Sequence, residues 1–309
     1  MIERINETVY SSPYSERLDN YLAEKFPYLS RSSWKNEIKN GNIAVNGIFP
    51  KSPSLMLKRN DTVRFYSLNR SEPPVDARHR ILYDDDFFLA AEKSGDIPVH
   101  PAGSYFNNTL LTILEHEFER KLFPVHRIDR ETSGIVLFAK SSVLSSALQT
   151  ALAQGRKTYT ALVKGCPPEF FENNLAIGPA ESAVRKKRKA FKNAEETAFT
   201  SFRRICSFGN YSLIKAFPRT GRLHQIRVHL ENCGFPIIGD KIYGGDETLF
   251  IEFISTGMTE TLEKKLLMKR CALHASKLEI CHPIENRMIT IASPLPEDFI
   301  DFIRTIRNG

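Results

Sequence analysis

The stretch that organises the chain is residues 126–134, His-Arg-Ile-Asp-Arg-Glu-Thr-Ser-Gly, in which five of nine side chains are charged or titratable. Residues 135–139, Ile-Val-Leu-Phe-Ala, follow directly, and such a β-branched and aromatic run predicts a buried strand. A polar loop therefore leads straight into the core, and Asp129 lies at the mouth of the strand. Taken alone, an Asp beside Arg residues indicates an ion pair, so the role of Asp129 depends on the rest of the chain.

The composition favours a soluble protein with a polyanionic partner. The 309 residues suffice for one large domain and one small domain, and 41% hydrophobic residues permit a proper core. The net charge of +7 and the pI of about 9.1 favour nucleic acid above all. An ordinary basic enzyme would show the same balance, so charge alone does not separate the two.

The cysteines and the N-terminal residues bear on the cellular compartment. The five cysteines are widely spaced and include no Cys-x-x-Cys pair, which argues against a disulfide framework and a structural zinc, and for a reducing compartment. The first residues are polar and acidic, unlike a signal peptide, and no apolar run approaches membrane-spanning length. We therefore expect a cytoplasmic protein that does not cross a membrane.

The N-terminal part of the chain predicts a small domain. Residues 1–15 suggest an irregular leader. Beyond them, apolar side chains at helical spacing predict one helix, and Ser30 or Ser32 can cap a second, basic helix. A short strand then enters the tight turn Asn46-Gly47.

This order of two helices and a hairpin resembles the alpha-L RNA-binding fold, which is shared with a small-subunit ribosomal protein. The resemblance covers residues 16–66 and implies that Arg31, Lys35 and Lys39 face RNA. A solvated helix face would explain any one of these three equally well. Residues 67–79 predict a polar, proline-containing linker, and we place the domain boundary there.

Residues 80–309 predict a larger domain. Strands are expected at 81–83, 87–91, 157–163, 197–202, 212–217 and 273–280, and helices at 110–122, 141–154, 222–230 and after 296. The acidic turn of Asp84 to Asp86 is expected to be solvated rather than to bind a metal. Tyr159 lies on a strand one helix after the strand of Asp129, so both side chains can meet at one end of a sheet. Arg227 lies on the apolar face of a predicted helix and needs a buried partner.

Four stretches of this domain resemble, in order, the motifs of the RluA-type family of RNA pseudouridine synthases. They are residues 126–134, 157–165 (Lys-Thr-Tyr-Thr-Ala-Leu-Val-Lys-Gly), 219–230 (Arg-Thr-Gly-Arg-Leu-His-Gln-Ile-Arg-Val-His-Leu) and 273–283 (Leu-His-Ala-Ser-Lys-Leu-Glu-Ile-Cys-His-Pro). The resemblance implies an α+β fold, with a catalytic domain on a mixed, mostly antiparallel central sheet flanked by helices, beside a small N-terminal α/β RNA-binding domain. Lys93-Ser94 departs from the usual Lys-Pro of the family, which affects the loop shape rather than the chemistry.

The resemblance also implies a reaction, the isomerisation of uridine to pseudouridine within RNA. The bond from C1′ to N1 breaks, the base rotates, and C1′ bonds to C5. This rearrangement needs no cofactor, and the sequence shows no phosphate-cradling glycine loop and no metal cluster. Asp129 matches the catalytic aspartate, which either attacks C1′ or removes the C2′ proton, and Arg227 matches its partner. Tyr159 matches the tyrosine that stacks on the base and helps remove the C5 proton, and Arg127 matches the side chain that fills the space left by the flipped uridine.

The basic block Arg185-Lys186-Lys187-Arg188-Lys189 is expected to be solvated and mobile, and it is the best candidate for binding phosphates. The expected substrate is large-subunit ribosomal RNA, with transfer RNA second, and the expected state is a monomer. Two alternatives stay open. One is a catalytically inactive RNA-binding protein of the same fold. The other is a glycoside hydrolase, which normally needs two carboxylates where we find one convincing candidate. Arg130 and Glu131 are expected to form a structural ion pair.

Overall fold

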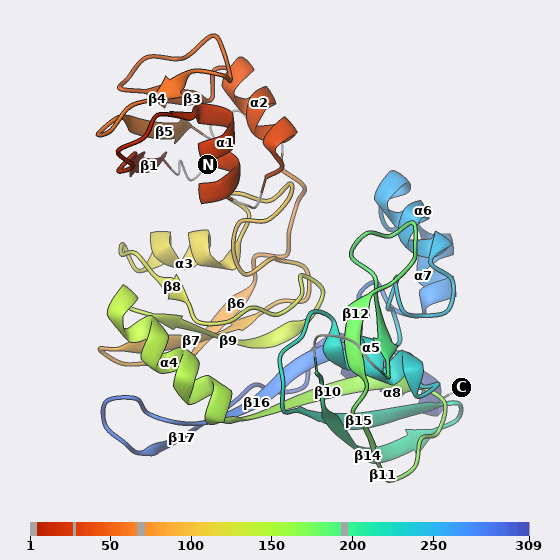
Figure 1. The fold of residues 1–309 in the computed structure, drawn as a ribbon. Helices are drawn as coiled ribbons and strands as arrows, with labels where there is room; N and C mark the ends of the chain where they lie inside the picture. Colours follow the sequence, from red (N-terminus) through yellow and green to blue (C-terminus); the bar gives the residue numbers. More distant parts are fainter. Residues whose placement is uncertain (1–4, 27–28, 67–71, 193–196, 309) are drawn as a thin grey trace. The chain divides into compact units, whose positions relative to one another are not determined.

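The computed structural model describes residues 5–26, 29–66, 72–192 and 197–308 (Figure 1). It divides into two compact units, one assigned residues 1–77 and 98–120 and the other residues 78–97 and 121–309. The boundary after Ala77 falls inside the expected linker, of which residues 67–71 lie outside the described residues. The chain therefore crosses from one unit to the other three times.

The N-terminal unit combines a small antiparallel sheet with helices. In chain order its elements are β1 (Ile5–Val9), β2 (Glu16–Arg17), α1 (Leu18–Lys25), α2 (Arg31–Lys39), β3 (Ile43–Val45), β4 (Met56–Leu57), β5 (Thr62–Tyr66) and α3 (Leu110–Glu117). The strands pair in the order β1-β5-β3, and β2 pairs with β4. Ser30 caps α2, as predicted, by accepting a hydrogen bond from the Ser33 N–H at 3.1 Å. Asn46 and Gly47 adopt the positive φ angles of a tight turn, also as predicted.

The compact units differ from the domains expected from the sequence at two places. Residues 5–9, expected in an irregular leader, form β1 and pair with β5 along their whole length. Residues 98–120, expected in the catalytic domain, pack in the N-terminal unit, where the rings of Phe106 and Phe65 meet edge-on with centroids 4.9 Å apart. The carboxylate of Glu72 fixes this segment, because it accepts hydrogen bonds from three consecutive backbone N–H groups that begin at Phe106.

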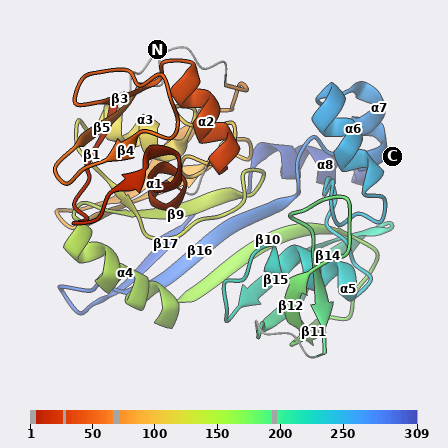
Figure 2. The same cartoon turned by 45° about the horizontal axis from the view of Figure 1, so that its top comes forward.

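The larger unit is built on a ten-stranded sheet, whose middle strands β9, β16 and β10 lie side by side in Figure 2. From one edge to the other the strands are β11 (Phe170–Asn173), β14 (Thr200–Phe208), β15 (Tyr211–Pro218), β10 (Arg156–Lys164), β16 (Leu273–Cys281), β9 (Ser133–Ala139), β7 (Phe88–Lys93) and β6 (His79–Asp84). In addition, β17 (Met288–Ala292) pairs with β16 and β8 (Phe123–Pro124) pairs with β9. The β16–β9 pair is parallel and its neighbours are antiparallel, so the sheet is mixed and mostly antiparallel, as predicted.

The helices of the larger unit are α4 (Ser142–Gln154), α5 (Gln225–Asn232), α6 (Thr248–Thr256), α7 (Glu260–Leu266) and α8 (Glu297–Asn308). Of these, α4, α5 and α8 pack on the sheet through two apolar clusters. Leu148 of α4 shares one cluster with Leu137 of β9, whereas Leu230 of α5 and Phe299 of α8 join the other cluster, around β10 and β15. A separate hairpin is formed by β12 (Ala176–Pro179) and β13 (Arg188–Phe191). Within the described parts of the chain, every helix is too short or too polar to cross a membrane.

Two predicted helices are shorter than expected, because of single backbone positions. The helix expected at 110–122 ends as α3 at Glu117, and Glu119 adopts a positive φ of 48°. The helix expected at 222–230 begins only after His224, which adopts a left-handed φ of 58°. This kink matters for the site, since it sets where the side chains of α5 point.

The acidic turn at residues 84–86 is solvated at Asp84 and Asp86, as expected, whereas Asp85 is hydrogen-bonded within the protein. Asp85 accepts hydrogen bonds from the backbone N–H groups of Phe87 and Phe88 at 2.8 and 2.9 Å, and it contacts the ring nitrogen of His282 at 3.0 Å. Asp85 therefore organises the turn between β6 and β7. Among the residues that the structure describes, no group of three or more histidine, cysteine or acidic side chains could hold a metal ion, at this turn or elsewhere.

Candidate active site

The loop that carries Asp129 is held on both sides before it enters β9. Gly134 adopts a φ of +109°, and a Cβ there would lie 2.3 Å from the carbonyl oxygen of Ala275 on β16. Only glycine lets the two strands approach this closely, so the position of the loop at the start of β9 is fixed. On the other side, the buried Lys93 Nζ donates to the carbonyl of Arg130 at 2.7 Å. Lys93 therefore supports the loop even though serine, not proline, follows it.

Asp129 and Arg227 form the ion pair that the sequence predicted. Arg227 Nη1 donates to Asp129 Oδ2 at 2.9 Å, and the Asp129 side chain keeps 23% of its surface exposed. Burial by itself would raise the pKa of Asp129, but the positive charge of Arg227 outweighs it and leaves the pKa below its ordinary value. Asp129 is therefore a carboxylate at neutral pH with one face open.

His224 is the second neighbour of this carboxylate, at 3.9 Å from Asp129 Oδ1. Burial lowers the pKa of His224 to about 4, with a further contribution from Arg227, so the imidazole is neutral at pH 7. Its Nδ1 and the hydroxyl of Tyr243 form a hydrogen bond of 2.8 Å. His224 is thus a structural neighbour of Asp129 that is neutral at pH 7.

The sequence did not reveal Asp240, which is the closest partner of Arg227. Arg227 Nε and Nη2 donate to the two carboxylate oxygens of Asp240 at 2.7 and 2.8 Å. The backbone N–H groups of Ile242 and Tyr243 add two more hydrogen bonds at 2.9 and 3.0 Å. Burial would raise the pKa of Asp240, but these donors, Arg227 foremost, lower it to about 2. The sequence shows only the dipeptide Gly239-Asp240 after the apolar pair Ile237-Ile238. A single dipeptide has no periodic pattern that would identify a buried acid.

Tyr159 lies on β10, opposite Ala275 of β16 and at a bulge that shifts the register of this pair. Burial raises the pKa of Tyr159 to about 12, and the negative charge of Asp129 contributes in the same direction. Tyr159 therefore lies within electrostatic reach of Asp129, in the middle of β10 rather than at an end of the strand. Arg127 lies in the same loop as Asp129, and its side chain is exposed.

A second layer of ion pairs surrounds this cluster. Glu131 accepts two hydrogen bonds from Lys241 Nζ, both at 2.8 Å, and lies 3.3 Å from Arg130 Nη2. The predicted Arg130–Glu131 pair is therefore present, but Lys241 is the closer partner of Glu131. The ring of Phe253 on α6 packs against this pair of cations, 4.7 Å from Lys241 Nζ and 5.7 Å from the Arg130 guanidinium.

The basic block is exposed at three of its five positions, as expected, and its last two residues belong to a strand. Arg188 and Lys189 belong to β13, whose pairing with β12 orders the hairpin. Lys187 Nζ donates to Glu247 at the start of α6 at 3.0 Å, which ties the hairpin to that helix. Arg185, Lys186 and Lys189 are exposed. An ordered hairpin presents these charges in a fixed arrangement rather than as a mobile run.

In the N-terminal unit, two of the three predicted RNA-facing cations are organised by a buried acid. Asp19 is fully buried and pairs with Arg31 at 2.9 Å, with Arg17 at 2.9 Å and with Lys35 at 3.8 Å. These three cations remain between 40% and 48% exposed, so their charge still faces solvent. Lys39 is exposed at the end of α2. A cluster with one buried acid and three cations has a net positive charge on that face.

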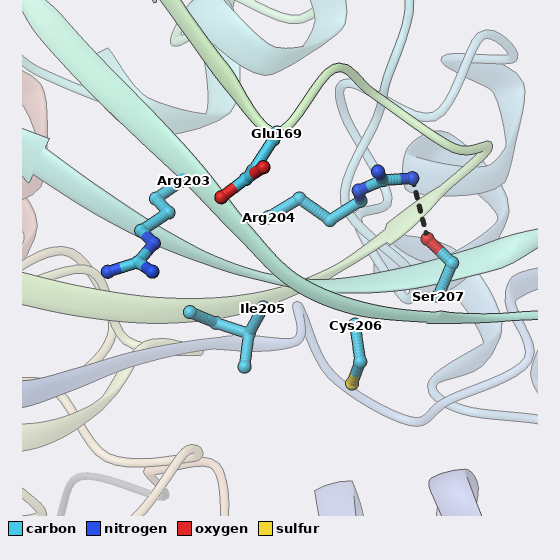
Figure 3. Close-up of a pocket in the computed structure, with 6 residues that line it drawn as sticks. All are labelled: Glu169, Arg203, Arg204, Ile205, Cys206 and Ser207. Atoms are coloured by element: carbon cyan, nitrogen blue, oxygen red, sulfur yellow. Dashed lines mark hydrogen bonds between the residues drawn. The ribbon is translucent and has the colours of Figure 1, made fainter.

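A surface depression of about 520 Å³ lies elsewhere on the larger unit, along β14. Figure 3 shows its lining, which consists of Glu169, Arg203, Arg204, Ile205, Cys206 and Ser207. None of the predicted catalytic side chains lines it. The depression is therefore separate from the cluster around Asp129.

Comparison with known proteins defines the class. The profile described as RNA pseudouridylate synthase matches residues 88–232, and the S4 domain profile matches residues 16–63. Ribosomal large subunit pseudouridine synthase D of Xanthomonas campestris pv. campestris is 31% identical over 311 residues, covering 97% of this chain and 91% of the relative. The chain belongs to the RNA pseudouridine synthase family and carries an N-terminal S4 domain.

Other relatives agree with this assignment. Ribosomal large subunit pseudouridine synthase D of Pseudomonas aeruginosa is 30% identical, covering 99% of this chain and 97% of the relative. An uncharacterized RNA pseudouridine synthase of Chlorobaculum parvum is 32% identical, covering 94% of both chains. Among solved structures, human RNA pseudouridylate synthase domain containing 4 matches with a TM-score of 0.57 and 22% identity, covering 74% of this chain and 92% of that one. The structural match supports the fold, and the sequence matches make the protein an isomerase.

Proposed function

We propose that this RNA pseudouridine synthase isomerises uridine in large-subunit ribosomal RNA, with Asp129 as the group that starts the reaction. The observation that carries the assignment is the Asp129 carboxylate itself, which stays ionised through Arg227 and keeps an open face at the end of the sheet. An open, ionised carboxylate can attack C1′ of the ribose or remove the C2′ proton, and both routes free N1 of the base.

In this proposal Tyr159 binds the flipped base through its ring and its hydroxyl. Its pKa of about 12 means that the phenol is protonated at neutral pH, so the hydroxyl donates a hydrogen bond rather than acting as a phenolate base. Stacking on an aromatic ring also compensates in part for the stacking that the uridine loses when it leaves the RNA. Tyr159 then helps to remove the C5 proton, as the resemblance implies, by hydrogen bonding rather than as a phenolate, and the carboxylate of Asp129 accepts this proton once the bond from C1′ to C5 has formed.

Arg127 is proposed to fill the space that the flipped uridine leaves. Its side chain is exposed and lies two residues before Asp129, so one loop would carry both the group that replaces the base and the group that reacts with it. A guanidinium suits this task, because its plane stacks on bases while its edge donates hydrogen bonds.

RNA binding beyond the site is proposed for two basic surfaces. One is Arg31, Lys35 and Lys39 in the S4 domain, and the other is the exposed side of the hairpin at 185–189. The names of relatives that match nearly the whole chain support ribosomal RNA as the substrate, and transfer RNA is the second candidate. We also propose that the enzyme acts as a monomer in the cytoplasm and needs no cofactor, since the rearrangement is internal to the substrate.

A glycosidase that cleaves without rejoining would need a second working carboxylate. Asp240 is the nearest candidate, but its two oxygens already accept four hydrogen bonds from nitrogen donors. Buried, ionised and hydrogen-bonded on both oxygens, Asp240 is poorly suited to serve as a general acid or base. This saturation favours isomerisation over hydrolysis.

The test combines RNA mapping with one substitution. Total RNA from cells with and without the gene is mapped for pseudouridine, and the sites that disappear identify the substrate. For purified Asp129→Asn we expect turnover to fall on the order of 10⁴-fold, the scale seen when a nucleophile or base is removed, while RNA affinity stays within about threefold. Tritium release from RNA labelled at uridine C5 measures turnover. An Asn variant with full activity would remove Asp129 from the mechanism, and free uracil among the products would indicate hydrolysis.

A further inference from the structure

Two carboxylates share the single guanidinium of Arg227, and they share it unequally. Asp240 takes Nε and Nη2 in a bidentate pair at 2.7 and 2.8 Å, whereas Asp129 takes only Nη1 at 2.9 Å. Asp240 is 1% exposed, and the thiol of Cys271 also approaches one of its oxygens at 3.5 Å. Arg227 therefore holds Asp240 by both carboxylate oxygens and Asp129 by only one.

This division has a geometric consequence. A guanidinium has five N–H donors in one rigid plane, so fixing Nε and Nη2 also fixes the direction in which Nη1 points. The backbone N–H groups of Ile242 and Tyr243 hold Asp240 in turn, and Gly239 lets the chain pass where a Cβ would lie 2.0 Å from the carbonyl oxygen of Arg270. The orientation of Arg227 is thus set by rigid backbone rather than by Asp129.

The division also has an electrostatic consequence. Without Asp240, the fork of Arg227 would be available to Asp129, and a bidentate pair would occupy both oxygens of the acid that must react. With Asp240 in place, the three side chains together carry one negative charge, and Asp129 is stabilised as a carboxylate through a single bond. The second oxygen, Oδ1, lies 3.9 Å from His224 Nε2, which is beyond hydrogen-bond distance.

We propose that Asp240 is a positioning residue for the isomerisation, which clamps Arg227 so that it offers Asp129 one hydrogen bond and leaves the other oxygen of Asp129 open to the ribose. Asp240 acts through Arg227 and need not touch the RNA. The inference rests on the proposed catalytic role of Asp129.

The decisive variant is Asp240→Asn. It removes the charge while keeping the shape, and it leaves one carboxylate to balance the buried Arg227, so the protein is expected to fold. The amide nitrogen of asparagine cannot accept a hydrogen bond from Arg227, so the bidentate pair is lost and the guanidinium is no longer held in one orientation. We expect kcat to fall about 10²-fold, the order that a misplaced catalytic group costs, while KM for the RNA stays within about threefold. Asp240→Glu keeps the charge but moves it by one methylene, and we expect a smaller fall of about tenfold.

A matched control is available in the same unit. Asp298 also forms a bidentate pair with Arg270, at 2.7 and 2.8 Å, although Asp298 is 41% exposed and Arg270 contacts the Asp129 loop only through the carbonyl of Glu131, at 3.3 Å. Asp298→Asn removes the same kind of pair and should lower the melting temperature while kcat of the folded protein stays within about twofold. A merely structural role for Asp240 would make the two variants alike once the folded fraction is taken into account.

The outcomes distinguish a failure of the proposed function from a failure of the positioning role of Asp240. An inactive wild-type enzyme, or a fully active Asp129→Asn variant, would contradict the proposed function itself. If those two behave as expected but folded Asp240→Asn keeps kcat within about threefold of wild type, the positioning role is wrong and the proposed function stands. If Asp240→Asn does not fold, Asp240→Glu decides, since an unchanged kcat in that variant would overturn the inference.

Discussion

At the scale of single residues, the site depends on a contrast between two acids that bind the same arginine. Asp240 has a pKa of about 2 and is enclosed, whereas Asp129 is ionised and partly open. A carboxylate that is hydrogen-bonded on both oxygens has a structural role, whereas a carboxylate with one oxygen outside hydrogen bonds can react. The same consideration applies to Tyr159, whose raised pKa indicates a neutral phenol at the pH at which the enzyme works.

The neutral phenol leads to a prediction about pH. If Tyr159 works protonated and Asp129 works ionised, the single-turnover rate on bound RNA should vary less than about threefold between pH 6 and 8.5, because both groups keep their state across that range. A phenolate base would instead gain about tenfold per pH unit, or more than 10²-fold over the same range. Rapid-quench tritium release at saturating enzyme measures the rate. A steep rise that disappears in Tyr159→Phe would contradict the neutral phenol.

Several residues of the site could be predicted from the sequence, and the reason is local. Asp129, Tyr159 and Arg227 stand in short runs whose order along the chain resembles a known family, and the apolar surroundings of Arg227 required an acidic partner. Asp240 could not be predicted, because its contact with Arg227 depends on how the loop after α5 folds back. The loop is set by Gly239 with a φ of +75°, and no periodic pattern encodes that bend.

At the scale of elements, strands and helices with a strong apolar pattern were predicted well, and their ends were not. The pairing of β14 with β15 and the core position of β16 follow from alternating apolar side chains. The start of α5 depends on one left-handed residue, His224, which tertiary contacts hold in place. The basic block shows the same limit, because the charges suggested a mobile run whereas Tyr243 and Glu247 tie it down.

The ordered hairpin leads to a prediction about RNA affinity. Changing Arg185, Lys186 and Lys189 together to glutamine should weaken binding and reduce the slope of log K against log salt by about 2, since each lost phosphate contact removes about 0.7 to 0.9. Filter binding from 50 to 300 mM KCl measures the slope. The matched control changes Lys264, Lys265 and Lys269 to glutamine. These changes remove three exposed charges from α7 and the residues after it. An equal effect in the control would mean that net charge, and not this hairpin, determines the slope.

At the scale of the whole molecule, three histidines with lowered pKa values make the stability of the larger unit depend on pH. The N-terminal unit then serves as the comparison. Burial lowers the pKa of His126, His224 and His274 to about 4, and all three belong to the larger unit. The single tryptophan, Trp34, is fully buried in the core of the N-terminal unit. Unfolding of the two units can therefore be followed by different signals, with Trp34 fluorescence reporting on the N-terminal unit.

The direction in which the free energy of unfolding changes with pH depends on which state, folded or unfolded, binds more protons. The unfolded histidines titrate near 6.5 and the folded ones near 4, so the unfolded state takes up protons first as pH falls, and stability is lost between pH 6.5 and 4. Each buried histidine should cost about 1 to 2 kcal/mol between pH 7 and pH 5. The raised pKa of Asp96 and of Glu231, both caused first by burial, offsets part of this loss. Asp240, with a pKa of about 2, stays ionised in this range and contributes nothing to the change.

Urea unfolding at pH 7 and pH 5 checks this difference between the units. We expect the transition followed by far-UV circular dichroism to move to lower urea at pH 5, by several kcal/mol in total, while the transition followed by Trp34 fluorescence moves less. His274 lies between Ser133 and Ser293 with no exposed surface, and His274→Asn should remove about a third of the pH dependence although it lowers stability at both pH values. Equal shifts of both signals in the wild type would show that the units unfold as one. A pH dependence unchanged in His274→Asn would show that this buried imidazole takes up its proton as readily in the folded state as in the unfolded state.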